Sequence, residues 1–120
     1  MIGKKTAEHY IWGENCDGWP LVKNKFLSVI HERMPPATSE VRHYHEKASQ
    51  FFFVLKGAAT LEIAGKREIL HEHEGAEIPP GVPHQLFNES GKEIEFLVIS
   101  RPPVGNDRVL IEDIKNESVK

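Results

Sequence analysis

The stretch that decides the fold is residues 41–57, Val-Arg-His-Tyr-His-Glu-Lys-Ala-Ser-Gln-Phe-Phe-Phe-Val-Leu-Lys-Gly. Two short segments, 41–45 and 50–55, contain residue types that favour strands, and the polar residues 46–49 between them predict a turn. The second segment is apolar at nearly every position, so we expect a strand with both faces buried. A glycine at position 57 ends it.

The rest of the chain repeats this pattern of short apolar runs separated by Gly, Pro and Asn, and no long stretch has the helical period of 3.6. The sequence therefore predicts an all-β domain. Further strands are expected at residues 26–34, 58–63, 67–70, 76–78, 84–88, 94–100 and, at an edge, 109–111. We divide the chain into an irregular N-terminal arm (1–24), a β-barrel domain (25–112) and a loose C-terminal tail (113–120).

Length and composition fit one ordinary soluble domain, with 120 residues, 39% hydrophobic and 28% charged. The formal net charge is −3 and no block of Lys and Arg stands out, which argues against nucleic-acid or anionic-membrane partners. No run approaches the ~18 apolar residues of a membrane span. The single cysteine, Cys16, excludes an internal disulfide and is interpreted as a plain loop thiol. With no signal-peptide pattern, a cytoplasmic location is expected.

Three histidines carry the chemistry that the sequence indicates. His43 and His45 are two apart on one predicted strand, so both side chains lie on the same face. The following turn brings Gln50 back beside them, and His84 follows a rigid Pro-Pro-Gly-Val-Pro turn at 79–83. Three imidazoles and one oxygen donor suit a divalent transition metal such as Zn, Fe, Mn or Ni, and also Cu.

These positions resemble the two motifs of the cupin family. The first has a His-x-His pair, a glutamate five residues on and a later glycine, matched here by His43, His45, Gln50 and Gly57. The second is a Pro-x-Gly turn followed by a histidine and an asparagine, matched at residues 79–88. The resemblance implies a double-stranded β-helix (jelly-roll) barrel and one divalent transition metal. This sequence departs from the first motif at Gln50. Glutamine is neutral and a weaker ligand than glutamate, so the site is left more positive. Glutamine also cannot act as a general base.

Less specific interpretations stand beside these. His43 and His45 could be polar strand residues facing water, and His84 could be a hydrogen-bonded wall residue. Gln50 could be a hydrogen-bond donor rather than a ligand. The histidines of the loop 71–74 are interpreted as solvated surface rather than a second metal site. By strand parity we expect the pocket around the metal to be lined by apolar residues: Val41, Phe52, Val54 and Leu86.

Two classes of function follow from the resemblance. One is a metal-dependent enzyme acting on a small polar or anionic metabolite, as an isomerase, dioxygenase, decarboxylase or lyase. The other is a non-enzymatic module that binds or senses a sugar or metabolite, because a fold alone does not choose between them. No catalytic base is assigned; Glu32, Tyr44 and Glu46 lie near the motif in sequence. The partners expected are a small-molecule ligand and, as in related small cupins, a second copy of the chain in a homodimer.

Overall fold

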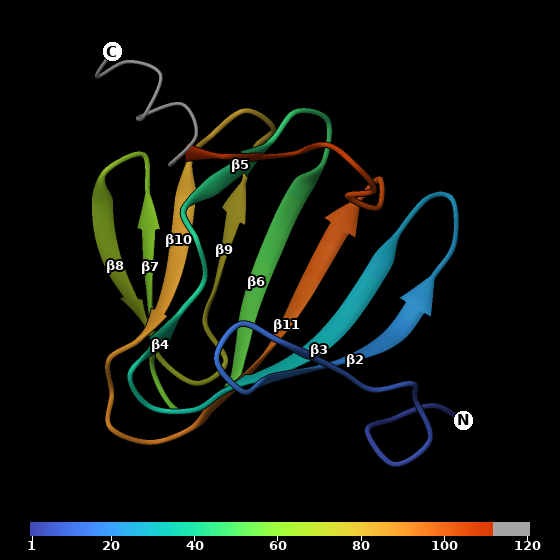
Figure 1. Ribbon diagram of the computed structural model, residues 1–120, viewed down its shortest axis with the longest axis horizontal. Helices are drawn as coiled ribbons and strands as arrows, with labels where there is room; N and C mark the ends of the chain where they lie inside the picture. Colours follow the sequence, from blue (N-terminus) through green and yellow to red (C-terminus); the bar gives the residue numbers. More distant parts are fainter. Residues whose placement is uncertain (112–120) are drawn as a thin grey trace.

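The structure, a computed structural model, describes residues 1–111 as two antiparallel sheets that face each other (Figure 1). The first sheet has the order β1-β2-β3-β11-β6-β9 and the second β12-β5-β10-β7-β8, with β4 paired to β10. The predicted all-β jelly-roll barrel is therefore confirmed. The strands are β1 (Tyr10–Trp12), β2 (Cys16–Lys23), β3 (Ser28–Met34), β4 (Thr38–Ser39), β5 (His43–His45), β6 (Ser49–Lys56), β7 (Ala59–Ile63), β8 (Lys66–Leu70), β9 (Gly75–Ile78), β10 (His84–Asn88), β11 (Ile94–Arg101) and β12 (Arg108–Leu110).

The core lies between the two sheets, where alternate residues of each strand point inward. On β11 the alternation is complete: Ile94, Phe96 and Val98 are buried, and the residues between them are partly exposed. They meet Leu61 and Leu86 of the second sheet in one hydrophobic cluster. This is the packing expected of two amphipathic sheets stacked face to face.

The irregular N-terminal arm predicted for residues 1–24 is wrong for much of its length. Tyr10–Trp12 and Cys16–Lys23 form an antiparallel hairpin, and the second strand pairs with β3. Cys16 is consequently not a loop thiol: it begins β2, is fully buried, and has its pKa raised by burial. The Gly and Pro residues of this segment made it look irregular, because both usually interrupt strands; Pro20 lies beyond the residues of β2 that pair with β1.

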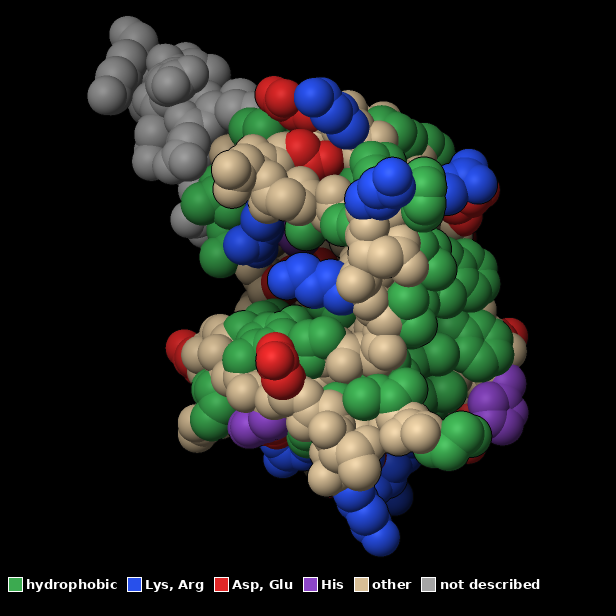
Figure 2. All heavy atoms as spheres, turned by 90° about the vertical axis from the view of Figure 1, so that its right-hand side faces the viewer, with side chains coloured by type: hydrophobic (Ala, Val, Ile, Leu, Met, Phe, Trp, Pro, Cys, Tyr) green, Lys and Arg blue, Asp and Glu red, His purple; other side chains and the backbone are tan. Residues whose placement is uncertain are grey.

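The prediction that both faces of 50–55 are buried is also wrong within the single chain. Phe52 and Val54 are buried, whereas Phe51 is 38% exposed. Figure 2 shows a broad hydrophobic area beside a hollow on one side of the molecule. The expected homodimer stays a prediction.

Residues 1–111 contain no helix that is long and apolar enough to cross a membrane. The tail predicted for 113–120 and the last residue of the predicted barrel domain lie outside the described residues.

Candidate metal centre in the barrel pocket

Strand pairing brings the three predicted histidines together at one end of the barrel. His43 lies directly opposite His84 where β5 pairs with β10, and His45 is two residues along β5 on the same face. All three are buried, and their ring centroids lie 4.4 to 5.9 Å apart. One nitrogen from each ring lies within 4.8 Å of the others, close enough for all three to reach a single ion.

The other ring nitrogen of each histidine is fixed by an oxygen. His43 Nδ1 donates to the carbonyl of Val41 at 2.7 Å, and His84 Nδ1 donates to the carbonyl of Val82 at 3.0 Å. His45 Nδ1 lies 2.8 Å from Oδ1 of Asp107. A carbonyl can only accept, so in neutral rings the hydrogen sits on Nδ1 and the lone pair on Nε2. Such partners set the tautomer and orientation of metal-binding histidines.

Burial favours the neutral form of His43 and His84. It lowers the pKa of His43 to about 3 and also lowers the pKa of His84. Burial by itself would raise the pKa of Asp107, but the N–H groups of Ala48 and Lys47, together with His45, hold it below its ordinary value. Neutral rings at His43 and His84, with an ionised carboxylate behind His45, suit metal binding, which requires deprotonated ligands.

Gln50 provides a test of whether a cation fits. Its Oε1 lies 3.2 Å from His84 Nε2, while its Nε2 donates to the hydroxyl of Ser100 at 3.0 Å. With the His84 hydrogen on Nδ1, two lone pairs face each other in a buried site. Burial opposes protonation of His84, whereas a shared cation or the opposite orientation of the Gln50 amide would each remove the conflict. Two ligands each about 2.1 Å from one ion lie about 3.0–3.4 Å apart, which matches this contact.

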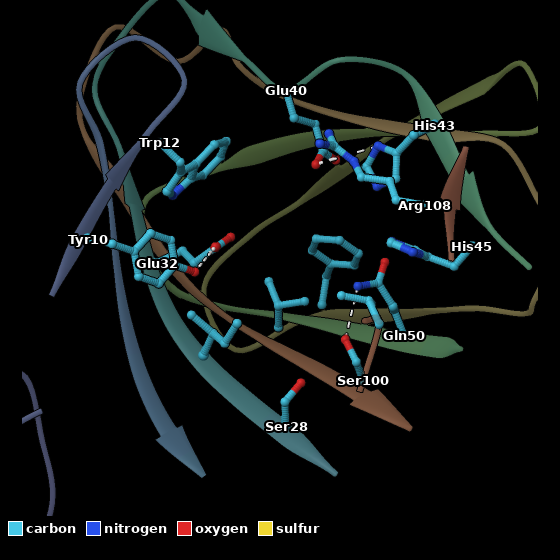
Figure 3. A pocket seen from close by; sticks show the side chains of 14 residues that line it. Tyr10, Trp12, Ser28, Glu32, Glu40, His43, His45, Gln50, Ser100 and Arg108 are labelled. Carbon is cyan, nitrogen blue, oxygen red and sulfur yellow. Dashed lines mark hydrogen bonds and ion pairs between the residues drawn. The ribbon is translucent and has the colours of Figure 1, made fainter. Parts of the chain in front are cut away.

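The histidines border an open pocket of about 250 Å³ between the two sheets (Figure 3). His43, His45 and Gln50 form one wall, and His84 lies buried behind them. Arg108 stands beside His45 because β12 pairs with β5 at these two residues. Its guanidinium gives the wall a fixed positive charge, suited to a carboxylate or phosphate.

Two carboxyl groups, from Glu32 and Glu40, also line the pocket. Burial raises the pKa of Glu40 to about 8, and that of Glu32 to about 7. Glu40 is held in place, because its Oε2 accepts from the backbone N–H of Leu86 at 2.9 Å and its Oε1 lies 3.9 Å from His43 Nδ1. Perturbed carboxyl groups in a cleft are typical of functional sites.

The structure brings His43, His45, Gln50 and His84 together as the sequence predicted, but it corrects the pocket lining. Phe52 lines the pocket. Val41 does not, because regular pairing of β5 starts at His43 and Val41 is 39% exposed.

Val54 and Leu86 share the correct face but are buried in the core instead of lining the pocket. Strand parity predicts the face and not the depth, and two residues advance a strand by about 7 Å.

Several residues of the site were missed by sequence reasoning. Asp107 precedes the edge strand β12 and Arg108 begins it. No motif spacing connects either residue with His45, which lies 62 residues before Asp107. Tyr10 and Trp12 were assigned to an irregular arm. Glu32 was noted only for its nearness in sequence.

Histidines outside the site have other surroundings. His31 lies 2.7 Å from Glu95 and edge-on to Trp19, as expected for a satisfied histidine. His71 and His73 are exposed, which agrees with a solvated loop.

The fold and the histidine cluster define a small β-barrel protein with a candidate metal centre in its mouth. A family model described as a cupin domain matches residues 30–100, more than half of the chain, and the protein therefore belongs to the cupin family.

A curated relative, an uncharacterized protein of Aquifex aeolicus (strain VF5), is 37% identical over 75 residues, which cover 62% of each chain. Two solved structures share the fold. KdgF from Halomonas sp. has a TM-score of 0.81 at 13% identity, over 88% of this chain and 96% of that one. A sugar phosphate isomerase of the cupin superfamily from Silicibacter pomeroyi has a TM-score of 0.73 at 21% identity, over 86% and 76%.

Proposed function

We propose that this cupin is a metal-dependent enzyme acting on a small anionic metabolite at the site formed by His43, His45 and His84. The observation that carries the proposal is the set of three Nδ1 contacts, which leave Nε2 of each ring for a ligand role in a cluster where one nitrogen of each ring lies within 4.8 Å of the others. Histidines that served only the core would not need a shared orientation. The sugar phosphate isomerase with the same fold supports a small polar substrate.

The residues of the chain divide the work. His43, His45 and His84 hold the ion, and Gln50 serves as a fourth ligand through Oε1. A bound divalent ion would polarise a substrate oxygen as a Lewis acid. Arg108 binds the anionic group, since its guanidinium offers paired donors to a carboxylate or phosphate. The buried Phe52 and Val98 in the pocket wall exclude water from the bound substrate.

The test uses the full chain, purified without a histidine tag. Elemental analysis after loading with Zn, Ni, Mn or Fe should find one metal ion per chain. Calorimetry should then show that oxalate, a small chelating anion, binds the loaded protein and not the metal-free one. Arg108→Met should retain the metal and weaken oxalate binding about 10- to 100-fold, as expected for a lost charge-assisted contact.

Metal well below one per chain after all four loadings would reject the proposal. Arg67→Met is the matched control for the arginine change, because Arg67 pairs with Glu89 on the surface, away from the pocket.

A module that binds a metabolite without converting it is the alternative, and Gln50 favours it, because the amide cannot serve as a general base. Oxalate binding combined with no turnover of carboxylate-bearing carbonyl compounds would favour this alternative.

A further inference from the structure

Among the strand residues within 1–111, Glu32 is the acidic residue that is neither exposed nor ion-paired, although the charge of Arg108 in the same pocket acts on it. Glu62 pairs with Arg42, Asp17 with Arg33 and Glu95 with Lys4. Glu32 instead points into the pocket from the inner face of β3, across from His45 and Gln50 (Figure 3). Within residues 1–111 it forms no ion pair, so a structural salt bridge does not explain a carboxyl group there.

Glu32 is held in place by residues that lie side by side on the neighbouring strands β1 and β2. Tyr10 on β1 lies opposite Gly18 on β2, and Gly18 lies opposite Glu32 on β3. Because Gly18 has no side chain, the ring of Tyr10 lies over it, and its hydroxyl donates to Oε2 of Glu32 at 3.3 Å. A Cβ on Gly18 would come within 2.3 Å of the tyrosine ring. The glycine thus creates the space through which Tyr10 reaches Glu32.

This arrangement leaves one oxygen of Glu32 for a ligand. The Tyr10 hydroxyl contacts Oε2, and no group of residues 1–111 donates to Oε1, which faces the pocket. Glu40, the other carboxyl of the pocket, also accepts one hydrogen bond, from the N–H of Leu86, but it lies on the histidine side, with Oε1 3.9 Å from His43 Nδ1. Burial raises the pKa of Glu32 to about 7, so both of its protonation states are populated near neutral pH, as acid–base catalysis requires.

We propose that Glu32 is the acid–base residue of the pocket and that it moves a proton between adjacent carbons of a small carboxylate-bearing carbonyl substrate, with Tyr10 as its positioning residue. This inference rests on the proposed function above. It narrows the reaction from the broad range of cupin chemistry to enolisation, a proton transfer next to a carbonyl.

The step balances without a further reactant. The ionised carboxyl of Glu32 takes the proton from the carbon beside the carbonyl, and the electrons of the broken C–H bond form the C=C bond of the enolate. The negative charge moves to the former carbonyl oxygen, on the side of the histidines. Glu32 then returns the proton, to the same carbon in simple exchange or to its neighbour in isomerisation.

The experiment follows deuterium exchange from D₂O into pyruvate, hydroxypyruvate and D-glucuronate by ¹H NMR, using metal-loaded protein. We expect exchange in at least one of these compounds. Glu32→Gln should lower that rate by about 100-fold or more, the usual contribution of a positioned acid–base group. Metal content and oxalate affinity should stay close to those of the wild type. Glu32→Asp should recover part of the rate.

Tyr10→Phe gives a readout that a merely structural role would not move. The hydroxyl stabilises the ionised form of Glu32, so its removal should raise the pKa of Glu32 and shift the acidic limb of the pH–exchange profile to higher pH. Glu77→Gln, which changes an exposed carboxyl outside this pocket, is the matched control and should leave exchange unchanged.

Exchange by Glu32→Gln within about threefold of the wild type would overturn the assignment, since acid–base removal costs far more. Absence of exchange by the wild type in all three compounds would overturn it as well. If the wild type binds metal and oxalate in that case, this inference fails while the metal and anion site stands, and the binding module becomes the favoured function. If it binds no metal, the proposed function itself has failed.

Discussion

The two walls of the pocket are built in different ways. The histidine wall comes from strands β5 and β10, whose site residues lie close together in sequence or follow a rigid turn, and each side chain is tied to a nearby backbone or carboxyl oxygen. The opposite wall comes from β1, β2 and β3, where Tyr10 meets Glu32 across 22 residues of chain and over a glycine.

From this difference we infer that one wall binds the ion and the other supplies the acid–base group. The histidine wall can hold an ion with its imidazoles oriented, and the carboxyl beside it in the pocket, Glu40, accepts from the N–H of Leu86 and lies 3.9 Å from His43 Nδ1. The opposite wall contributes a carboxyl group and a hydroxyl but no residue of the histidine cluster. Variants of one wall should therefore change metal affinity, and variants of the other should leave it intact.

The largest effect is expected from His84→Ala. It removes a nitrogen from the centre of the cluster together with the partner of Gln50, so metal binding should fall below detection. Loss of the contact to Val82 should lower the free energy of unfolding by about 1–3 kcal/mol, which leaves the fold intact. Calorimetric metal titration and thermal melts measure both quantities. His71→Ala, in the exposed loop, should bind metal as the wild type does, and equal affinity in both variants would contradict the three-histidine centre.

The next effect is expected from Asp107→Asn. Asp107 fixes His45 through Oδ1 and is itself held by the N–H groups of Lys47 and Ala48 through Oδ2. The amide keeps the shape but loses the charge behind the imidazole, so metal affinity should fall about 10- to 100-fold. Competition with a chelator of known affinity gives the ratio. An unchanged affinity would show that His45 needs no carboxyl partner.

A smaller change of opposite sign is expected from Gln50→Glu. Glutamate restores an anionic ligand, and metal affinity should rise by about tenfold, or ~1.4 kcal/mol. If affinity is unchanged, Gln50 is not a ligand and serves only to connect Ser100 with His84. Gln85→Glu is the matched control, because the side chain of Gln85 donates to the carbonyl of Glu40 rather than facing the cluster.

The same two walls explain how far the sequence could be interpreted. His43, His45 and His84 were predictable because a two-residue spacing and a rigid turn are local features that fix side-chain direction. The row of Tyr10, Gly18 and Glu32 was not predictable, because it depends on the register of three strands, one of them only three residues long. Val41 was predicted wrongly for a different reason. The alternation of side-chain direction holds only within a regular strand, and β5 begins at His43.

Gly18→Ala tests most directly whether the two walls act independently. It changes the wall that contains Glu32, and we expect no change in metal affinity. The new methyl group would lie 2.3 Å from the ring of Tyr10, so the ring must move and its contact with Glu32 is lost. Overpacking of this kind costs about 1–3 kcal/mol of stability. Gly3→Ala is the control, because its Cβ would meet no atom within 4 Å.

A double-mutant cycle with Tyr10→Ala should remove most of the stability lost in Gly18→Ala, because the new methyl group clashes with the ring of Tyr10. If metal affinity falls in Gly18→Ala as it does in Asp107→Asn, the two walls are coupled and Glu32 supports the histidines rather than the substrate.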